Sequence, residues 1–440
     1  EQSSSITTKS PSYDHYIRWR THTMSVGENK VQAPFLYDGT AEPPEDVVSL
    51  EICSSVEELP HLFLCQNFCH RKKLKYVKFN EGLKTIGASA FYECRSLEGI
   101  KFPSTLVQIE NYAFCKCRTL KYVIFNEGLK TIGSLAFQGC ESLEVIKFPS
   151  SLAETGYEVF SQCKALKEVY FHEELIKIGP SAFSGCGSLR KIECPSSLVE
   201  IGYCAFCGCD GLREVLLNEG LANIGDYAFS SCTSLERMEL PSTIADIPDY
   251  AFFSCTSLER MELPSTIVDI GNGAFYGCEA LKEVLLNEGI VDIKECTFFR
   301  CTSLERIELP STLRNIRDWA FKECQALREV MLNGRLNSID IRSFDECESL
   351  EGICFPCIPR RLESITCDRS KADIYDKLSA IRHVSMVDSK LLISGPPLDG
   401  VGWERCMEKL DRILRLMDYH EFQLKEATTV FELALWKSEM

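Results

Sequence analysis

The 440-residue sequence lacks any hydrophobic run of the about 18 residues that a membrane-spanning helix needs. Basic residues are also scarce: 48 Lys and Arg against 64 Asp and Glu give a formal net charge of −16. A protein that binds nucleic acid needs a basic surface to displace phosphate counterions. The sequence therefore predicts neither a membrane span nor a nucleic-acid partner.

Cysteine, in contrast, is abundant, with 24 residues, and half of them form a regular series. A Phe stands three residues before each member of this series, and a Leu stands three residues after it. One more unit, with Phe68 and Leu74, has Arg71 in place of the Cys. The series recurs every 23 residues, at Cys94, Cys117, Cys140, Cys163, Cys186, Cys209, Cys232, Cys255, Cys278, Cys301, Cys324 and Cys347. The chain is therefore an array of about 13 repeats, with the consensus L-x-x-I-x-F-x-x-x-L-x-x-I-G-x-x-A-F-x-x-C-x-x.

The L-x-x-I-x-F part of the unit alternates between inward and outward residues, which is the pattern of a half-buried strand. The rest of the unit is too short, and too often broken by Pro or Gly, for a long helix, so it should return by turns or a 3₁₀ segment. A single unit cannot bury its own apolar residues, and stability must come from stacking on neighbours. We therefore predict a solenoid whose strands form a parallel sheet.

The repeat I-G-x-x-A-F-x-x-C-x-x-L-x-x-I-x-F-P resembles the BspA-type, or Treponema-type, leucine-rich repeat over residues 68–355. The resemblance implies a curved leucine-rich-repeat solenoid, which we class as an α/β-type repeat fold, and a role in protein binding. It also implies relatives among bacterial surface proteins and proteins of unicellular eukaryotes, and no catalytic residue. This sequence departs from the family's Gly at Glu110, Pro248, Lys294, Arg317 and Asp340. Because proline fixes φ near about −65°, that position does not require a positive φ.

The two ends of the chain differ from the array. We predict an irregular leader at residues 1–46, an N-terminal capping unit at 47–67, the solenoid at 68–357 and a C-terminal cap at 358–395. Residues 371–384 have the spacing of a short helix, and residues 396–440 have that of an amphipathic helical tail. That tail either docks on the end of the solenoid or serves self-association through its apolar stripes.

The outward positions of the predicted strands alternate in charge along most of the array, as on a self-neutralised sheet surface. The first third differs, because aromatic and aliphatic residues stand beside lysines there, with Gly99 leaving a gap. That composition is typical of the core and rim of a protein interface, although an ordinary sheet surface has similar residues. The candidate partner-binding residues are Tyr76, Lys78, Lys101, Tyr122, Ile124, Val145, Lys147 and Tyr170.

Two kinds of turn follow the strands in alternation, Asn-Glu-Gly and Pro-Ser-Ser/Thr, which gives a superperiod of 46 residues. The alternation fails once, because residues 231–244 and 254–267 have the same sequence, SCTSLERMELPSTI. We interpret this as the duplication of one unit. An array whose length can change in this way is typical of binding solenoids.

Residues that could carry chemistry are few. The chain has 7 His, of which only His172 lies among the units with the regular Cys, and no Ser-His-Asp or Cys-His arrangement recurs. The other cysteine groups lie many units apart, so they do not supply the four converging ligands of zinc: Cys65 with Cys69 and His70, Cys204 with Cys207, and Cys354 with Cys357. We predict no catalytic site, no metal and no cofactor.

The regular cysteines should be buried free thiols, because parallel side chains on stacked units point the same way, a poor geometry for a disulfide. Free thiols, the lack of an N-x-Ser/Thr sequon among twelve Asn and the lack of a hydrophobic signal segment favour a cytoplasmic protein. Removal of a segment before Glu1 would instead allow an extracellular or cell-surface protein. We predict a non-catalytic scaffold that binds a protein partner through the concave sheet face. The alternative is a secreted or cell-surface adhesion module.

Overall fold

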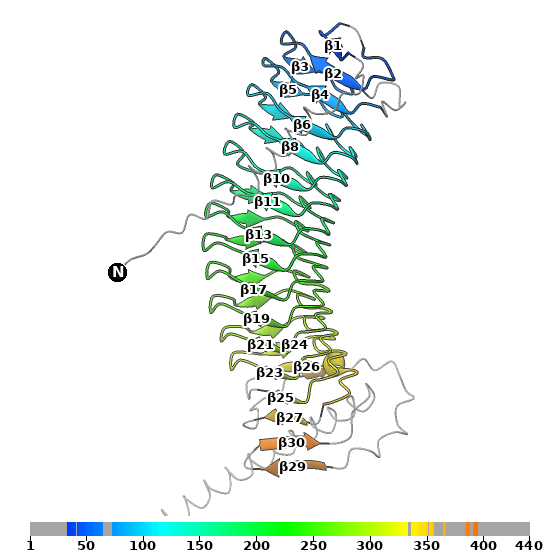
Figure 1. Cartoon of the computed structure of the whole chain (residues 1–440). Coiled ribbons are helices and arrows are strands. Elements are labelled where there is room, and N and C mark those ends of the chain that lie inside the picture. The colour runs from blue at the N-terminus through cyan, green and yellow to red at the C-terminus, as the bar shows by residue number, and fades with distance from the viewer. Residues whose placement is uncertain are drawn as a thin grey trace, which may run out of the picture.

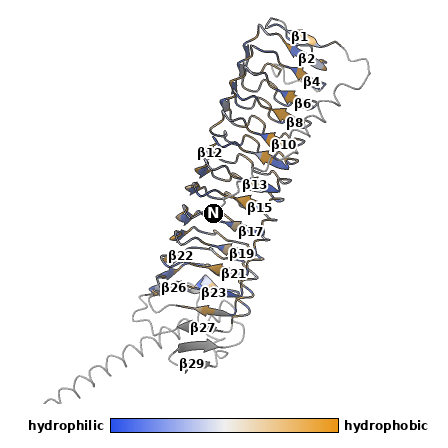
Figure 2. Cartoon of the chain, turned by 60° about the vertical axis from the view of Figure 1, so that its left-hand side comes forward, coloured by the Kyte–Doolittle hydropathy of each residue, from blue (hydrophilic) through white to orange (hydrophobic). Residues whose placement is uncertain are grey.

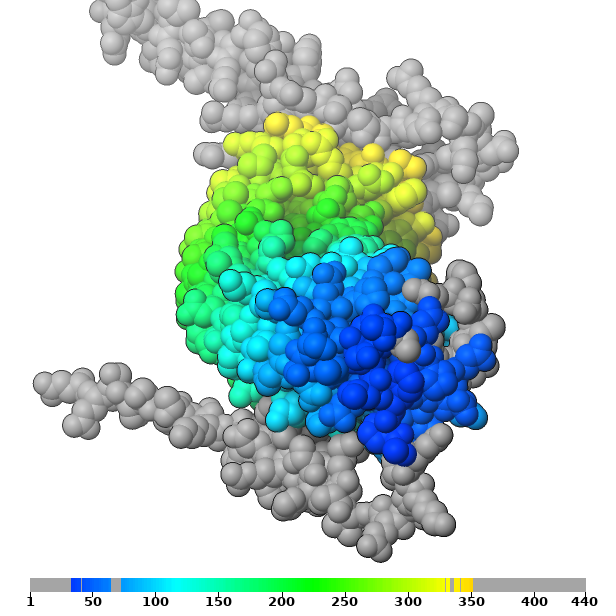
Figure 3. Space-filling view, turned by 90° about the horizontal axis from the view of Figure 1, so that it is seen from above, coloured from blue at the N-terminus to red at the C-terminus, as the bar shows by residue number. Residues whose placement is uncertain are grey.

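The computed structural model of the chain describes residues 33–40, 42–64, 73–332 and 336–350, and the backbone of four strands beyond them. In this part of the chain, short parallel strands stack turn upon turn into one long, curved column (Figure 1). Figure 3 shows the column from its N-terminal end, with successive turns fanned out from blue to yellow. The predicted parallel-sheet solenoid is confirmed.

Each unit contributes one strand to a first ladder of parallel strands. In β13, β15, β17, β19, β21 and β23 the middle residue is buried and both flanking residues are exposed, as the alternation in the sequence predicts. The ladder contains β1 (Phe35–Tyr37), β2 (Ser49–Ile52), β4 (Tyr76–Lys78), β6 (Gly99–Lys101), β8 (Tyr122–Ile124), β10 (Val145–Lys147), β11 (Glu168–Tyr170), β13 (Lys191–Glu193), β15 (Glu214–Leu216), β17 (Arg237–Glu239), β19 (Arg260–Glu262), β21 (Glu283–Leu285), β23 (Arg306–Glu308), β25 (Glu329–Met331) and β27 (Gly352–Phe355). Strand pairing is interrupted between β11 and β13 and between β15 and β17.

A second ladder of shorter strands forms another side of the column. It contains β3 (Glu58–Leu59), β5 (Thr85–Ile86), β7 (Gln108–Ile109), β9 (Thr131–Ile132), β12 (Lys177–Ile178), β14 (Glu200–Ile201), β16 (Asn223–Ile224), β18 (Asp246–Ile247), β20 (Asp269–Ile270), β22 (Asp292–Ile293), β24 (Asn315–Ile316), β26 (Ser338–Asp340) and β28 (Ser364–Thr366). From β5 to β26 the Ile of each strand points into the core, and it is buried in every strand except β16. The residue before the Ile faces outward. Each turn therefore presents one outward side chain on this side of the column.

The A-F-x-x-C segment of each unit forms consecutive tight turns, which make the third side of the column. The amide of Cys115 donates to the carbonyl of Tyr112 and so closes a turn, whereas the amide of Phe114 donates across to the carbonyl of Ala136 in the next unit. This alternation recurs along the array. The return by turns is therefore as predicted, and the α/β class is wrong: apart from the 3₁₀ segment η1 (Ile341–Phe344), the described residues contain no helix.

In the turns that end at Cys94 to Cys324, two residues have left-handed backbone, five residues and one residue before the regular Cys; in the turn that ends at Cys347 only Glu346 does. Tyr112 (φ 60°) and Lys116 (φ 59°) are one such pair. The position of the family's Gly, which Pro248 occupies in one unit, is not left-handed anywhere in the described array. The prediction drawn from the proline substitution is therefore confirmed, and the strained positions lie at places where the sequence has no consistent Gly.

Phenylalanine rings form the centre of the core. Those that precede the regular Cys by three residues stack from Phe91 to Phe344, with ring centroids 4.9 to 6.0 Å apart. In Figure 2 hydrophobic and hydrophilic residues recur in every turn, because each turn supplies its part of one continuous core. Stability therefore comes from contacts between turns rather than within them.

The regular cysteines are buried free thiols, and those from Cys117 to Cys347 are each bonded to the preceding unit. Cys209 Sγ donates to the carbonyl oxygen of Phe183 at 3.2 Å, and Cys232 Sγ donates to that of Phe206 at 3.3 Å. Burial raises the pKa of the Cys209 and Cys232 thiols, and it raises that of Cys255 to about 12. A small side chain with a weak donor fits this position, because it fills the core and also satisfies a buried carbonyl.

The alternation of turn sequences has a direct structural cause. Glu127 of an Asn-Glu-Gly turn accepts hydrogen bonds from the amide and the hydroxyl of Ser150 in the next turn, at 2.8 and 2.7 Å. On the other side, Asn126 donates to carbonyl oxygens of the preceding turn, that of Leu106 at 2.9 Å. The Glu-to-Ser bond recurs at Glu81 with Ser104, Glu173 with Ser196, Glu219 with Ser242 and Glu288 with Ser311. Turns of one kind thus interlock with turns of the other kind on both sides.

The ends of the described array differ from several predictions. Strand β1 lies within the predicted leader and pairs with β2, so the sheet begins before the predicted capping unit at 47–67. Strands β29 (His383–Val387) and β30 (Lys390–Ser394) form a hairpin whose β30 pairs antiparallel with β27. The last two residues of the predicted helix at 371–384 belong to β29, and the rest of it lies outside the described residues, as do the helical tail at 396–440 and part of the predicted unit that begins at Phe68.

Candidate functional site

The eight predicted partner-binding residues lie on five neighbouring strands of one sheet, β4, β6, β8, β10 and β11. The first positions of these strands lie side by side, with Tyr76 beside Gly99, Gly99 beside Tyr122 and Tyr122 beside Val145. The third positions form a parallel row in which Lys101 lies beside Ile124, and Lys147 beside Tyr170. The structure therefore brings the predicted residues together on one side of the column.

The gap predicted at Gly99 does not exist, because the ring of Tyr122 fills it. A Cβ atom at Gly99 would lie 2.0 Å from the Tyr122 ring. Gly99 is buried, although it occupies an outward position of its strand. Tyr122 therefore leans across onto the neighbouring strand. Any larger residue at position 99 would displace that ring, so Gly99 positions a residue of the candidate site.

Apolar and charged side chains share this surface. The rings of Tyr76, Tyr122 and Tyr170 are half-buried, whereas the lysines are exposed. Lys78 Nζ contacts Glu51 Oε1 at 2.6 Å, and this hydrogen bond is the main reason why the pKa of Glu51 is lowered. The candidate-site prediction missed Glu51, because it stands in β2 and outside the regular repeat. The Tyr170 hydroxyl donates to Glu168 at 2.6 Å, so this ring is held in place by its own strand.

Further along the same side, the sheet surface is mostly self-neutralised. Lys191 contacts Glu193 at 2.6 Å on its own strand and Glu214 at 3.4 Å on the next strand. Exposed pairs of this kind contribute about 0.2 to 1 kcal/mol each. The more aromatic surface is therefore the one at β4 to β11.

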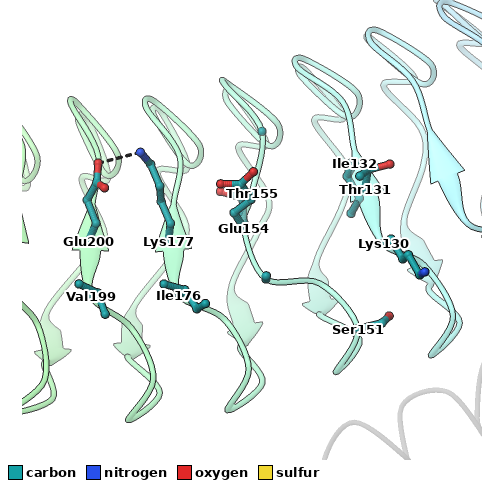
Figure 4. Close-up of a pocket in the computed structure, with 12 residues that line it drawn as sticks. Lys130, Thr131, Ile132, Ser151, Glu154, Thr155, Ile176, Lys177, Val199 and Glu200 are labelled. Atoms are coloured by element: carbon teal, nitrogen blue, oxygen red, sulfur yellow. Dashed lines mark ion pairs between the residues drawn. The ribbon is translucent and has the colours of Figure 1, made fainter.

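A hollow of about 540 Å³ lies on the second ladder, where the pairing between β9 and β12 is interrupted (Figure 4). Thr155 stands there in place of the inward Ile of neighbouring turns, and its Oγ1 accepts the amide of Gly179 at 2.8 Å. The chain at 153–155 is bonded to the following turn but, within the described residues, the amides of Ala153 and Glu154 and the carbonyl of Lys130 make no hydrogen bond. The hollow results from the loss of these bonds between turns.

The side chains around the hollow suit binding rather than catalysis. Ile176 and Val199 give it an aliphatic wall, and Lys177 is paired with Glu200 at 2.9 Å, as Figure 4 shows. No His and no Cys lines it. The lining contains no paired nucleophile and base.

The other candidates for chemistry remain apart. In the described part of the chain, no three His, Cys, Asp or Glu side chains are grouped so that they could hold a metal ion. Cys204 and Cys207 are half-buried, and burial raises the pKa of Cys204 to about 11, which disfavours a reactive thiolate. The groups at Cys65 and at Cys357 lie outside the described residues.

No described residue belongs to a helix with the length and hydrophobicity of a membrane span. The third side of the column carries a row of aromatic residues that the candidate-site prediction missed, from Tyr203 to Phe299. The residues in this row stand two, five or six positions before the regular Cys. The signal that could have identified them is the recurrence of aromatic residues at these positions in successive units.

Comparison with known proteins places this geometry in a family. The family model described as the BspA type leucine-rich repeat region, with 6 copies, matches residues 64–190, 176–290 and 245–370. No curated protein matches the chain. Among solved structures, the chain is similar to a leucine-rich repeat protein from Bacteroides ovatus, at 29% identity and a TM-score of 0.55, over 63% of this chain and 77% of that one.

Two further solved structures are similar to the chain. One is a leucine-rich cell surface protein from Faecalibacterium prausnitzii, at 23% identity and a TM-score of 0.46, over 72% of this chain and 87% of that one. The other is a leucine-rich repeat protein from T. pallidum, at 28% identity and a TM-score of 0.36, over 43% of this chain and 78% of that one. Because the family matches cover more than half of the chain and coincide with the stacked turns, the chain belongs to the BspA-type leucine-rich repeat family.

Proposed function

We propose that this chain is a recognition or adhesion module that binds a protein partner through the outward surface of β4 to β11. Family membership supports a repeat scaffold of the kind that mediates protein interactions or adhesion. Such a scaffold is non-catalytic in type.

One observation carries the choice of surface. Three tyrosine rings and the aliphatic side chains of Ile124 and Val145 lie on adjacent strands in register, bordered by Lys78, Lys101 and Lys147. Half-buried aromatic residues need little further ordering when a partner covers them, because their positions are already fixed by the sheet. An apolar centre with a charged border is the arrangement expected of a protein interface.

The cytoplasmic location predicted from the thiols loses its support, and we favour the secreted or cell-surface alternative. The regular cysteines are buried and bonded to carbonyl groups of neighbouring turns, so burial protects them from oxidation. Their reduced state therefore says little about the compartment. Family membership agrees with the alternative.

The test is a crosslinking pull-down with two matched double variants. Tyr76→Ala with Tyr170→Ala removes two rings of the proposed surface, and Tyr112→Ala with Tyr157→Ala removes two exposed rings from the turn side. We expect the first variant to reduce capture of the partner by about tenfold or more and the second to leave it unchanged. Equal thermal stability of both variants would exclude unfolding as the cause. Unchanged capture by the first variant, or equal loss in both, would remove this surface from consideration.

A further inference from the structure

Six aromatic side chains form a continuous row on the turn side of the column, which we call the aromatic ribbon. It consists of Tyr203, Tyr227, Tyr250, Phe253, Tyr276 and Phe299. The centroids of Tyr227 and Tyr250 lie 4.8 Å apart, and those of Tyr276 and Phe299 lie 4.6 Å apart, both with nearly parallel rings. These rings lie outside the Phe core and are partly exposed to solvent, Tyr203 by 52%.

An acidic border accompanies the ribbon. Asp226 and Asp249 immediately precede Tyr227 and Tyr250, and Glu295 lies further along the same row of positions. Asp226 accepts the amide of Asp249 at 3.1 Å, so its carboxylate is held in place. None of these three carboxylates is in an ion pair within the described residues, in contrast to the paired charges of the sheet surface.

The part of the array that contains the ribbon is acidic as a whole. Residues 191–350 contain 14 Lys and Arg against 27 Asp and Glu, a net charge of −13, whereas residues 73–190 contain 15 against 12, a net charge of +3. The ribbon lies in the acidic half. A basic partner would therefore be attracted to the end of the column that bears the ribbon.

One unit shows how a cation binds to this pair of positions. Asp318 and Trp319 occupy the same places in their turn as Asp226 and Tyr227 in theirs. Arg342 from the next turn contacts Asp318 Oδ2 at 2.6 Å and lies over the Trp319 ring, 5.2 Å from its centroid. The guanidinium group thus uses the carboxylate and the aromatic ring together, as arginine does in many interfaces.

A second cation, that of Lys322, contacts the last ring of the ribbon. Lys322 Nζ lies 6.0 Å from the centroid of the Phe299 ring. At Asp226 with Tyr227 and at Asp249 with Tyr250, no Lys or Arg of the described chain takes the corresponding place. An acid and aromatic pair of this design therefore holds an arginine at the end of the array. In the middle no Lys or Arg of the described chain does so, and Asp249 instead accepts the amide of Asn272 at 2.7 Å and its Nδ2 at 3.1 Å.

We propose that the aromatic ribbon and its acidic border form a second docking surface, which binds an extended, arginine-rich peptide segment of a partner protein. The guanidinium groups bond to the carboxylates and the tyrosine hydroxyls, and the aliphatic stems pack on the exposed ring edges. Neighbouring turns are about 4.8 Å apart, and alternate side chains of an extended peptide are about 6.6 Å apart. Arginine side chains are long and flexible enough to compensate for the difference between these two spacings.

The test uses the full chain and a fluorescent peptide of about eight residues that alternates Arg and Ser, with binding measured by anisotropy. The ribbon variant carries Asp226→Asn, Asp249→Asn and Glu295→Gln. The control variant carries Glu239→Gln, Glu262→Gln and Glu308→Gln, which remove the same charge from the sheet side. We expect the ribbon variant to bind about tenfold more weakly and the control to change by less than about twofold.

Two further measurements distinguish binding at the ribbon from attraction of a basic peptide to the net negative charge of the chain. Tyr203→Ala with Tyr227→Ala should weaken binding of the Arg peptide at unchanged net charge, and a Lys-Ser peptide should bind more weakly than the Arg-Ser peptide. Equal weakening in the ribbon and control variants would show attraction to net charge alone and overturn the proposal. The absence of saturable binding by the parent chain would overturn it as well.

Discussion

Residues 231–244 and 254–267 have the same sequence but different interactions. Ser242 donates its hydroxyl to Glu219 of the preceding turn at 2.9 Å, and its amide bonds to the same carboxylate at 3.0 Å. Ser265 is the equivalent residue of the second segment, and in the described structure it has no such partner, because the turn before it is another Pro-Ser-Thr turn. On the other side, Asn287 donates to the carbonyl oxygen of Pro264, whereas no asparagine side chain bonds to Pro241. Each copy thus retains one of the two interlocks of a regular unit.

The core does not distinguish the two copies. Cys232 Sγ and Cys255 Sγ each donate to a Phe carbonyl of the preceding unit, at 3.3 and 3.1 Å. The Phe rings continue through both copies without a gap. Within the array, the interior interactions of a turn therefore follow from its own sequence, and its surface interactions follow from its neighbours.

The surface charges show the same dependence on neighbours. The duplication places Arg237 beside Arg260, and Glu239 beside Glu262, on adjacent strands. A regular junction places opposite charges together, as in Lys191 beside Glu214. Like charges side by side on adjacent strands destabilise the pairing. The duplicated junction therefore has an intact core and a less favourable surface.

The largest expected change in stability comes from substitutions in the core, and it tests whether the core is equally well packed at the duplication and in a regular unit. Phe252→Ala, between the two copies, and Phe206→Ala, in a regular unit, each remove a buried ring that lies between two stacked rings. We expect both to lower the free energy of unfolding by the same amount, about 3 to 5 kcal/mol, measured by denaturant unfolding. A much smaller loss for Phe252→Ala would show that the duplication has loosened the core, and the comparison above would fail.

A smaller effect separates the two copies at their surface. Ser242→Ala removes the hydroxyl bonded to Glu219 and should lower the free energy of unfolding by about 1 kcal/mol. Ser265→Ala, in an identical local sequence, should change it by about zero. Both variants can be measured by the same denaturant titration, and Ser196→Ala serves as a regular interlocked control that should behave like Ser242→Ala. Equal losses at 242 and 265 would contradict the role of the neighbouring turn.

The smallest effect concerns charge. Glu239→Lys replaces a like-charged neighbour of Glu262 by an opposite one, and should raise the free energy of unfolding by about 0.2 to 1 kcal/mol. Glu308→Lys makes the same substitution at the same place in β23, where the neighbours are Leu285 and Met331, and should have almost no effect. The difference between the two variants should decrease at high salt, because exposed charges are screened. A difference that persists in high salt would point to a cause other than charge.

The sequence is sufficient to predict the strands and the core, because both depend on alternation and on the 23-residue spacing. From Phe91 and Cys94 onward, every residue of the Phe and Cys series lies in the core, as that spacing requires. The left-handed residues were not predictable, since Tyr112 and Lys116 are not residue types that favour this conformation. They adopt it because their own amides donate to the next unit, that of Tyr112 to Ser134 and that of Lys116 to Gln138, while the amides that follow them close turns within the unit. The α/β class failed for a related reason: the unit is too short for a helix, and its return segment is held by bonds between units.

The candidate surface was predictable only in part. A strand period of two places the outward rows, and the structure confirms that Tyr76, Tyr122 and Lys101 share one side of the sheet. The direction in which the Tyr122 ring leans depends on the small residue on the adjacent strand, which the period does not encode. The aromatic ribbon was missed because its residues occupy several different positions of the unit, so they become a row only when the turns are stacked.

The hydrogen bonds between Asn-Glu-Gly and Pro-Ser turns favour an array in which the two kinds of turn alternate without a break. If recombination adds or removes two neighbouring units, every Glu again faces a Ser and every Asn again faces a Pro-Ser turn. A change of one unit leaves a mismatched junction, as the segments 231–244 and 254–267 show. Descendants of this array are therefore expected to differ in length mainly by multiples of 46 residues, and units inserted singly should be followed by surface substitutions that restore the alternation.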